Sequence, residues 1–220
     1  MKKIAIFSIL TFISMFVLGQ NSFSIYFAQT YSKFKFIDSD GVQDESLSFD
    51  INYSYGVNYS KAYKTGLLLR PELCYKNFGA ISSVNNERLE WSLNYLDVNF
   101  GIGYIFNKWD IQPYFGISPY FAYLYKADQI IGNTYFDMLE NKSILKFDFG
   151  LNEFLGIKYV ISDMVSLFFE MRNSTGLHQL EPNIEISESQ KLYNRAVSIG
   201  FGLSFSIYKY KTPKIWRSSF

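Results

Sequence analysis

The sequence predicts an all-β protein in which eight antiparallel strands form a transmembrane β-barrel after a cleaved signal peptide. Three observations lead to this fold class. Apolar and polar residues alternate along most of the chain, the alternating segments are long, and short connections between them take turns with long ones. Successive side chains of a strand point to opposite faces, so this alternation builds a wall with one apolar and one polar face.

The N-terminus predicts a secretory signal peptide. Lys2 and Lys3 precede an apolar run from residue 4 to 18, and the small residue Gly19 follows. A run of this length is short for a transmembrane helix, which needs about 20 apolar residues, so a membrane anchor is the weaker alternative. We therefore expect a signal peptide over residues 1–20, cleaved near Gly19 or Gln20, and one barrel domain over residues 21–220.

The last predicted strand shows the alternation most clearly. Its apolar row starts at Val197 and ends at Ile207, and Ser or Gly residues fill the positions between. Seven earlier segments have similar patterns and run longer than the five or six residues usual in soluble sheets. The eight predicted strands are 22–37, 46–60, 65–78, 89–106, 111–125, 145–161, 164–175 and 197–207.

The connections predict how the barrel is oriented. Short turns are expected at residues 61–64, 107–110 and 162–163, and longer polar loops at 38–45, 79–88, 127–144 and 176–192. Bacterial outer-membrane barrels have short periplasmic turns and long extracellular loops. If the first strand starts in the periplasm, the same arrangement applies here, and the expected location is the cell outer membrane of a Gram-negative bacterium.

Aromatic residues favour a lipid-facing wall over a soluble β-sandwich or lipocalin, whose apolar face points inward. Phe, Tyr and Trp make up 20% of the chain. Several lie near predicted strand ends, where they match the aromatic girdles of membrane barrels. These residues are Tyr59, Tyr63, Phe106, Trp109, Tyr123, Tyr125, Tyr208 and Tyr210.

The polar face predicts a lumen filled with paired charges. Arg70 and Glu72 lie on the third predicted strand, Glu170 and Arg172 on the seventh, and Asp97 on the fourth is expected to join them. The third and seventh strands face each other across an eight-stranded barrel, whose interior is just wide enough for side chains to fill. We interpret the five residues as a structural ion-pair network in a closed barrel; the alternative is an ion or proton path.

Four short motifs resemble the PorT-like outer-membrane β-barrel family of small, OmpA-type eight-stranded barrels. They are Asn94-Tyr95-Leu96-Asp97-Val98, Gln112-Pro113-Tyr114-Phe115-Gly116-Ile117-Ser118-Pro119-Tyr120, Phe147-Asp148-Phe149-Gly150 and Asn194-Arg195-Ala196-Val197-Ser198-Ile199-Gly200-Phe201. This chain departs from the family pattern at Asp97, Asn99 and Ser118. The resemblance implies a membrane barrel, and a secretion-system component among some members makes a secretion accessory one alternative function.

The closing strand resembles the signal read by barrel-assembly machinery, in which a polar residue and a glycine precede spaced apolar residues. The matching positions are Ser198, Gly200, Leu203 and Phe205. The resemblance implies barrel-assembly machinery as a partner, besides outer-membrane lipid.

The remaining chemistry is sparse. Cys74 and His178 are the only residues of their types, and the 21 basic side chains nearly balance the 20 acidic ones. We therefore expect no metal, no cofactor, no nucleic-acid partner and no enzymatic activity. One alternative is a rim-active lipid A-modifying enzyme that uses His178 with Ser174, Thr175 or Glu181.

The leading hypothesis is a structural or binding barrel that is not an open pore. Its long extracellular loops would meet an extracellular or secretion-complex protein, because function concentrates on loops held by a rigid scaffold.

Overall fold

A computed structural model describes residues 19–38, 40–44, 47–84, 87–132, 134–182 and 191–207. The predicted signal peptide lies almost wholly outside these residues, as do Tyr208 and Tyr210 of the expected girdles. Among the described residues, no helix has the length and apolar character needed to span a membrane.

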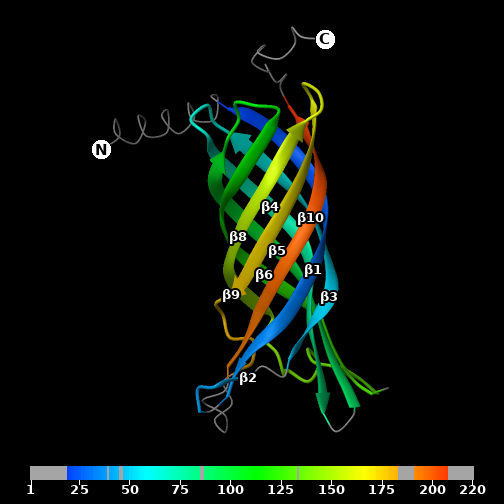
Figure 1. Cartoon of the computed structure of the whole chain (residues 1–220). Helices are drawn as coiled ribbons and strands as arrows, with labels where there is room; N and C mark the ends of the chain where they lie inside the picture. Colours follow the sequence, from blue (N-terminus) through cyan, green and yellow to red (C-terminus); the bar gives the residue numbers. More distant parts are fainter. Residues whose placement is uncertain are drawn as a thin grey trace, which may run out of the picture.

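The described chain is an antiparallel β-sheet that closes on itself (Figure 1). Neighbouring strands follow the order β10-β9-β8-β6-β5-β4-β3-β1, and β1 then pairs with β10. Two short strands, β2 and β7, pair with extensions of β1 and β6. The elements are β1 (Gln20–Ile37), β2 (Gln43–Asp44), β3 (Ser48–Ala62), β4 (Leu67–Val84), β5 (Glu87–Ile105), β6 (Ile111–Ile131), β7 (Thr134–Asp137), β8 (Phe147–Val160), β9 (Val165–Gly176) and β10 (Lys191–Ser206).

The seam between the first and last strands is continuous. It runs from the pair Ser22–Ser206 to the pair Ile37–Lys191 without a register shift. Closure leaves no free sheet edge, which a lipid environment requires because hydrocarbon offers no hydrogen-bonding partner to backbone groups. The predicted eight-stranded antiparallel barrel is therefore confirmed.

The two ends of the barrel differ. One end, here called the short-turn end, holds the three tight connections between β3 and β4, β5 and β6, and β8 and β9. At the first of these Gly66 has a φ of 95°, which favours glycine, and its N–H donates to the Tyr63 carbonyl at 2.9 Å. The opposite end, here called the loop end, carries the longer connections together with β2 and β7.

Two loops predicted at the loop end are wrong in part, because the barrel strands continue through them. Most of the predicted loop 79–88 is strand, and β4 and β5 pair up to Val84 and Glu87. The predicted loop 127–144 begins with the end of β6 and includes β7. Polar residues in these stretches suggested loops, but strands that leave the membrane keep their ladder while their outer face meets water.

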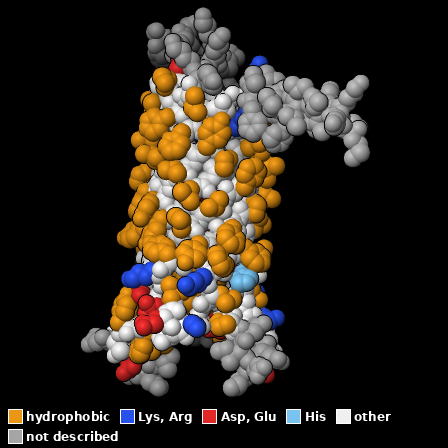
Figure 2. All heavy atoms as spheres, turned by 180° about the vertical axis from the view of Figure 1, so that it is seen from behind, with side chains coloured by type: hydrophobic (Ala, Val, Ile, Leu, Met, Phe, Trp, Pro, Cys, Tyr) orange, Lys and Arg blue, Asp and Glu red, His pale blue; other side chains and the backbone are white. Residues whose placement is uncertain are grey.

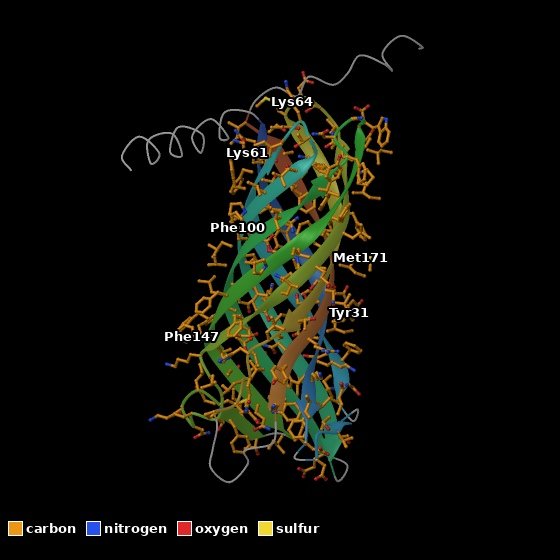
Figure 3. All side chains as sticks on the ribbon, turned by 90° about the vertical axis from the view of Figure 1, so that its left-hand side faces the viewer. Tyr31, Lys61, Lys64, Phe100, Phe147 and Met171 are labelled. Atoms are coloured by element: carbon orange, nitrogen blue, oxygen red, sulfur yellow. The ribbon has the colours of Figure 1, made fainter. Side chains whose placement is uncertain are left out.

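A broad apolar belt covers the outside of the barrel (Figure 2). Figure 3 shows Phe100, Phe147 and Met171 projecting outward from the wall; their exposed fractions are 54%, 49% and 45%. The outward row of β10, from Val197 to Ile207, has about the 9–11 residues that a tilted strand needs to cross hydrocarbon. An exposed apolar surface of this extent has lipid as its solvent.

Candidate functional site in the barrel lumen

Four predicted charges meet inside the barrel and form a closed ion-paired group, here called the charged layer. The Arg172 guanidinium donates to Glu72 at 2.6 and 3.0 Å and to Glu170 at 2.8 Å. Arg70 donates to both oxygens of Glu170 from the opposite wall, and its Nε lies 3.8 Å from Glu72. All four side chains are nearly inaccessible, so each charge depends on its partners.

Aromatic rings surround the charged layer. Hydroxyls of Tyr26 and Tyr114 donate to Glu72 at 2.8 Å and to Glu170 at 3.0 Å. The Arg70 guanidinium lies 4.0 Å from the ring centre of Phe154, a cation–π contact. Two arginines and two glutamates give no net charge, and most of their hydrogen bonds are made with one another and with the two tyrosine hydroxyls. This arrangement links opposite walls of the barrel and can stabilise it. Each of the four charged groups is paired, so none is free to act as a general acid or base.

Asp97 lies in an adjoining layer of the lumen. Its carboxylate accepts from Lys76 Nζ at 2.5 Å, and it makes no ion pair with Arg70 or Arg172. Asn99 donates to Glu72 at 3.3 Å, and its oxygen accepts from Asn152. Lys76 donates to Asn152 at 3.5 Å, so the two layers are joined through Asn152 and Asn99. Sequence reasoning missed Lys76 as the partner of Asp97, although it follows from the same inward alternation on β4.

A third group lies nearer the loop end, and each of its members comes from a different one of the four sequence motifs. The Asp148 carboxylate accepts from the Tyr120 hydroxyl at 3.0 Å and from Asn194 Nδ2 at 2.8 Å. Asn194 also donates to the Tyr95 hydroxyl at 3.2 Å. Motifs that are far apart in the sequence therefore contribute one residue each to a single buried hydrogen-bonded cluster. This shared contact explains why the four residues occur in the same chain.

An apolar plug fills the lumen at the loop end. Leu93, Leu124 and Leu180 are fully buried in it. Leu180 belongs to the segment after β9, and its backbone pairs with Leu145 and Leu192 at 2.7 and 2.9 Å. Loop residues therefore seal the mouth of the barrel. The buried members of the plug are Phe34, Phe78, Ala80, Leu93, Tyr95, Tyr120, Ala122, Leu124, Ala127, Ile144, Leu180, Leu192 and Ala196.

The plug was missed in the sequence, although a signal for it exists. On β5 the apolar row is odd-numbered at Leu93 and Tyr95 and even-numbered from Leu96 onward. The apolar face of the strand therefore changes sides at this point.

The residues considered for a rim enzyme are not brought together. His178 lies against Phe149, a lipid-facing residue, with 5.1 Å between ring centres and the two ring planes tilted by 41°. Ser174 points into the lumen, where its hydroxyl donates to Asn152 at 2.7 Å. The barrel wall thus separates the imidazole from the hydroxyl, and a serine nucleophile needs an adjacent base.

The residues of the closing strand divide between the two faces. Ser198 faces inward and hydrogen-bonds Thr30 across the seam at 2.9 Å. Gly200 also faces inward, and a Cβ there would lie 2.7 Å from Cβ of Ala28. Leu203 and Phe205 belong to the outer face, where Phe205 is 42% exposed. Within the described residues, no group of three or more His, Cys, Asp or Glu side chains could hold a metal ion.

Comparisons with known proteins agree with this architecture. The family described as outer membrane protein beta-barrel domain matches residues 19–181, which locates the protein in the cell outer membrane. No curated protein matches the sequence. The outer membrane protein OprG from Pseudomonas aeruginosa has 11% identity and a TM-score of 0.51, covering 86% of this chain and 96% of its own.

Two further solved structures are small surface barrels with lower TM-scores. Neisserial surface protein A has 13% identity and a TM-score of 0.47, over 86% of this chain and 97% of its own. Ail, the attachment invasion locus protein of Yersinia pestis, has 14% identity and a TM-score of 0.45, over 86% and 99%. At these identities the likeness concerns the fold alone.

Proposed function

This chain belongs to the outer membrane protein beta-barrel domain family, and we propose that it is a closed barrel that presents a binding surface at its loop end. The observation that carries the proposal is the filled lumen. The charged layer, the Asp97–Lys76 layer and the apolar plug follow one another along the interior. A conducting pore needs a continuous aqueous path, whereas these layers are held by direct side-chain contacts.

The loop end offers a supported surface for a macromolecular partner outside the cell. Leu177 and Tyr135 are 59% and 56% exposed there, and Phe136 is 39% exposed. Backbone pairing of β7 with β6 and of Leu180 with both neighbouring segments holds these residues in place. Exposed apolar and aromatic side chains on a preorganised scaffold are typical of protein-binding sites. We therefore propose a protein partner, with the PorT-like resemblance leaving a secretion complex as one source of it.

Conductance measurements test the closed lumen. Wild-type barrel reconstituted in planar bilayers should show no steady currents, because the charged layer and the apolar plug block its interior. A variant that lacks the plug side chains, Leu93→Ala with Leu124→Ala, serves as the positive comparison and should show more transient openings. Steady wild-type currents at low voltage would contradict the proposal.

Affinity capture from outer membranes tests the binding surface. The double substitution Tyr135→Ser with Phe136→Ser removes the exposed rings of β7 but leaves in place Met138 and Leu139, which pack against the plug. This variant should lose a protein that wild type captures, while its heat-modifiable gel migration stays that of a folded barrel. A matched control, Lys64→Ala at the short-turn end, should capture the partner normally. Equal capture by all three proteins would exclude the loop end as the binding surface.

A further inference from the structure

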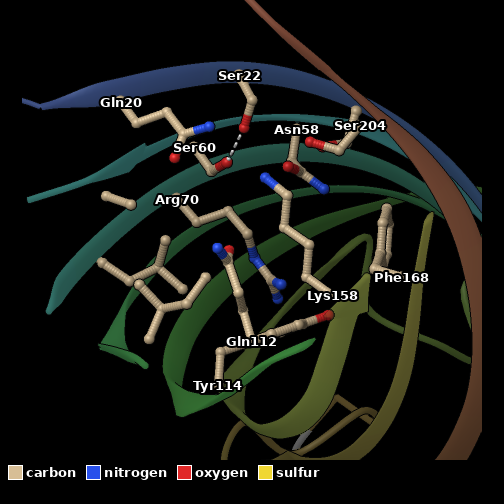
Figure 4. Close-up of a pocket in the computed structure, with 14 residues that line it drawn as sticks. Gln20, Ser22, Asn58, Ser60, Arg70, Gln112, Tyr114, Lys158, Phe168 and Ser204 are labelled. Atoms are coloured by element: carbon tan, nitrogen blue, oxygen red, sulfur yellow. Dashed lines mark hydrogen bonds between the residues drawn. The ribbon is translucent and has the colours of Figure 1, made fainter. Parts of the chain in front are cut away.

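A pocket opens inside the barrel at the short-turn end (Figure 4). The pocket, together with the open solvent at its mouth, holds about 490 Å³ of space between the inward faces of the strands near their short turns. The polar side chains that matter here are those of Ser22, Ser60, Arg70, Lys158 and Ser204. Because the barrel wall separates it from lipid, a ligand of this pocket is a soluble molecule and not a lipid headgroup.

The charges in this pocket are unbalanced. Arg70 and Lys158 line it, and no acidic side chain does. Arg70 is committed to Glu170 and Glu72, and the charged layer to which it belongs is neutral by itself. Lys158 is 9% exposed, and its ammonium has no hydrogen bond or ion pair with any described residue. The pocket thus carries one uncompensated positive charge.

Hydroxyl groups face the same space. Ser204 is 2% exposed, and its Oγ has no hydrogen-bond partner among the described residues. Ser22 and Ser60 share one hydrogen bond of 2.7 Å, which leaves one hydroxyl proton of the pair to donate elsewhere. Figure 4 shows the Lys158 side chain reaching across the pocket toward Ser60 and Asn58. One ammonium and two spare hydroxyl donors match the acceptors of an oxyanion.

We propose that this pocket binds a small soluble oxyanion of the phosphate or carboxylate class. Its charge neutralises Lys158, and its oxygens accept from Ser204 and the Ser22–Ser60 pair. A buried ammonium without a partner is costly, and an anion that pairs with it removes that cost. The proposal concerns the short-turn end only and is independent of any partner at the loop end.

Titration with inorganic phosphate in nonionic detergent, at constant ionic strength with chloride as reference, tests the site by calorimetry. Wild type should bind phosphate saturably. Lys158→Gln should weaken binding about ten-fold or more, since hydrogen bonds to charged groups contribute about that factor, and Ser204→Ala should weaken it less. Lys126→Gln, which alters an exposed lysine near the loop end, should bind as wild type does.

Lys158→Gln removes an unpaired buried charge, so it should fold at least as well as wild type. If this variant fails to fold, the wild-type protein still tests the proposal. NMR of isotopically labelled lysine should then show that the chemical shifts of Lys158 Cε and Nζ change as phosphate is added. Absence of saturable phosphate binding by wild type would overturn the proposal. Unchanged binding by Lys158→Gln, or a static Lys158 signal, would do the same.

Discussion

In the half of the barrel nearer the short turns, here called the membrane half, outward side chains are mostly apolar and inward ones mostly polar, apart from a small buried cluster of Leu68, Ile105, Tyr114 and Phe154. In the half nearer the long loops, here called the loop half, a large apolar cluster fills the lumen. Strand β5 contains both situations within four residues. Leu96 faces outward and is 48% exposed, whereas Leu93 faces inward and is fully buried in the plug. On the outer face beside Leu93, Asn77 donates to Ser92 at 3.1 Å and to Asn94 at 2.7 Å.

The difference follows from the solvent on the outer side. Lipid gives apolar side chains no reason to turn inward, so the lumen of the membrane half can hold charges provided that they are paired. Where the same strands reach water, the hydrophobic effect turns the apolar face inward, as in a soluble barrel. The largest buried interactions are therefore ion pairs in the membrane half and apolar contacts in the loop half, and each half should respond most to a different kind of substitution.

The largest effect is expected in the charged layer. Arg172→Ala removes one of the two arginines that pair with Glu72 and Glu170 and leaves the layer with an uncompensated negative charge in a closed interior, so it should lower the free energy of unfolding by about 3–5 kcal/mol. Denaturant unfolding from lipid vesicles measures this loss. Arg88→Ala, which removes an exposed arginine 3.0 Å from Glu90, is the control and should cost at most about 1 kcal/mol.

The plug lies further along the lumen toward the loop end and is not touched by this substitution, so Arg172→Ala should remain closed in planar bilayers. A loss below about 1 kcal/mol for Arg172→Ala would mean that water reaches the charged layer and solvates it, and the contrast between the two halves would then fail.

Much of the membrane half could be predicted from the sequence because alternation there is governed by one solvent on each side. Arg70, Glu72, Glu170 and Arg172 occupy inward positions that period two alone assigns, and the short turns bring β4 and β9 to opposite walls. The loop half was harder to predict because the solvent on its outer side is water and not lipid. Polar residues such as Ser82 and Ser83 indicate a loop if lipid is assumed outside, but are compatible with a strand if water is.

Contacts that depend on tertiary placement could not be predicted. Leu180 follows the last residue of β9 by four positions in a stretch without alternation, and only the closed barrel shows that it reaches the plug. The separation of His178 from Ser174 depends likewise on which side of the wall the chain takes after Gly176.

Two leucines on β5 give a sharper test of the contrast. Leu93→Ala opens a cavity in the plug and should lower the free energy of unfolding by about 2–5 kcal/mol, as large-to-small changes in soluble cores do. Leu96→Ala removes the same atoms from a lipid-facing position, where lipid tails fill the space, and should cost clearly less. Both variants are measured in the same vesicles. Equal losses would show that Leu93 and Leu96 have the same surroundings, contrary to the change of face at Tyr95.

The smallest effect is expected at Glu153, which departs from the pattern of the membrane half. It lies near the middle of β8, faces outward and is exposed, and it accepts a hydrogen bond of 3.1 Å from Asn173 on β9. Its neighbour on the other side is the apolar Ile117. Charged residues on a lipid face are destabilising, carboxylates less so than Lys or Arg, so Glu153→Leu should raise the free energy of unfolding by about 1 kcal/mol.

Glu153→Gln separates the charge from the hydrogen bond, since it keeps an oxygen that accepts from Asn173. If the carboxylate is the unfavourable group, Gln should recover most of the gain seen with Leu, and Asn173→Leu should recover little. If Glu153→Leu instead destabilises the barrel, Glu153 has a partner on the outer face and this part of β8 does not contact lipid. The membrane half would then have an interface within its apolar belt, and only the remaining strands would face lipid.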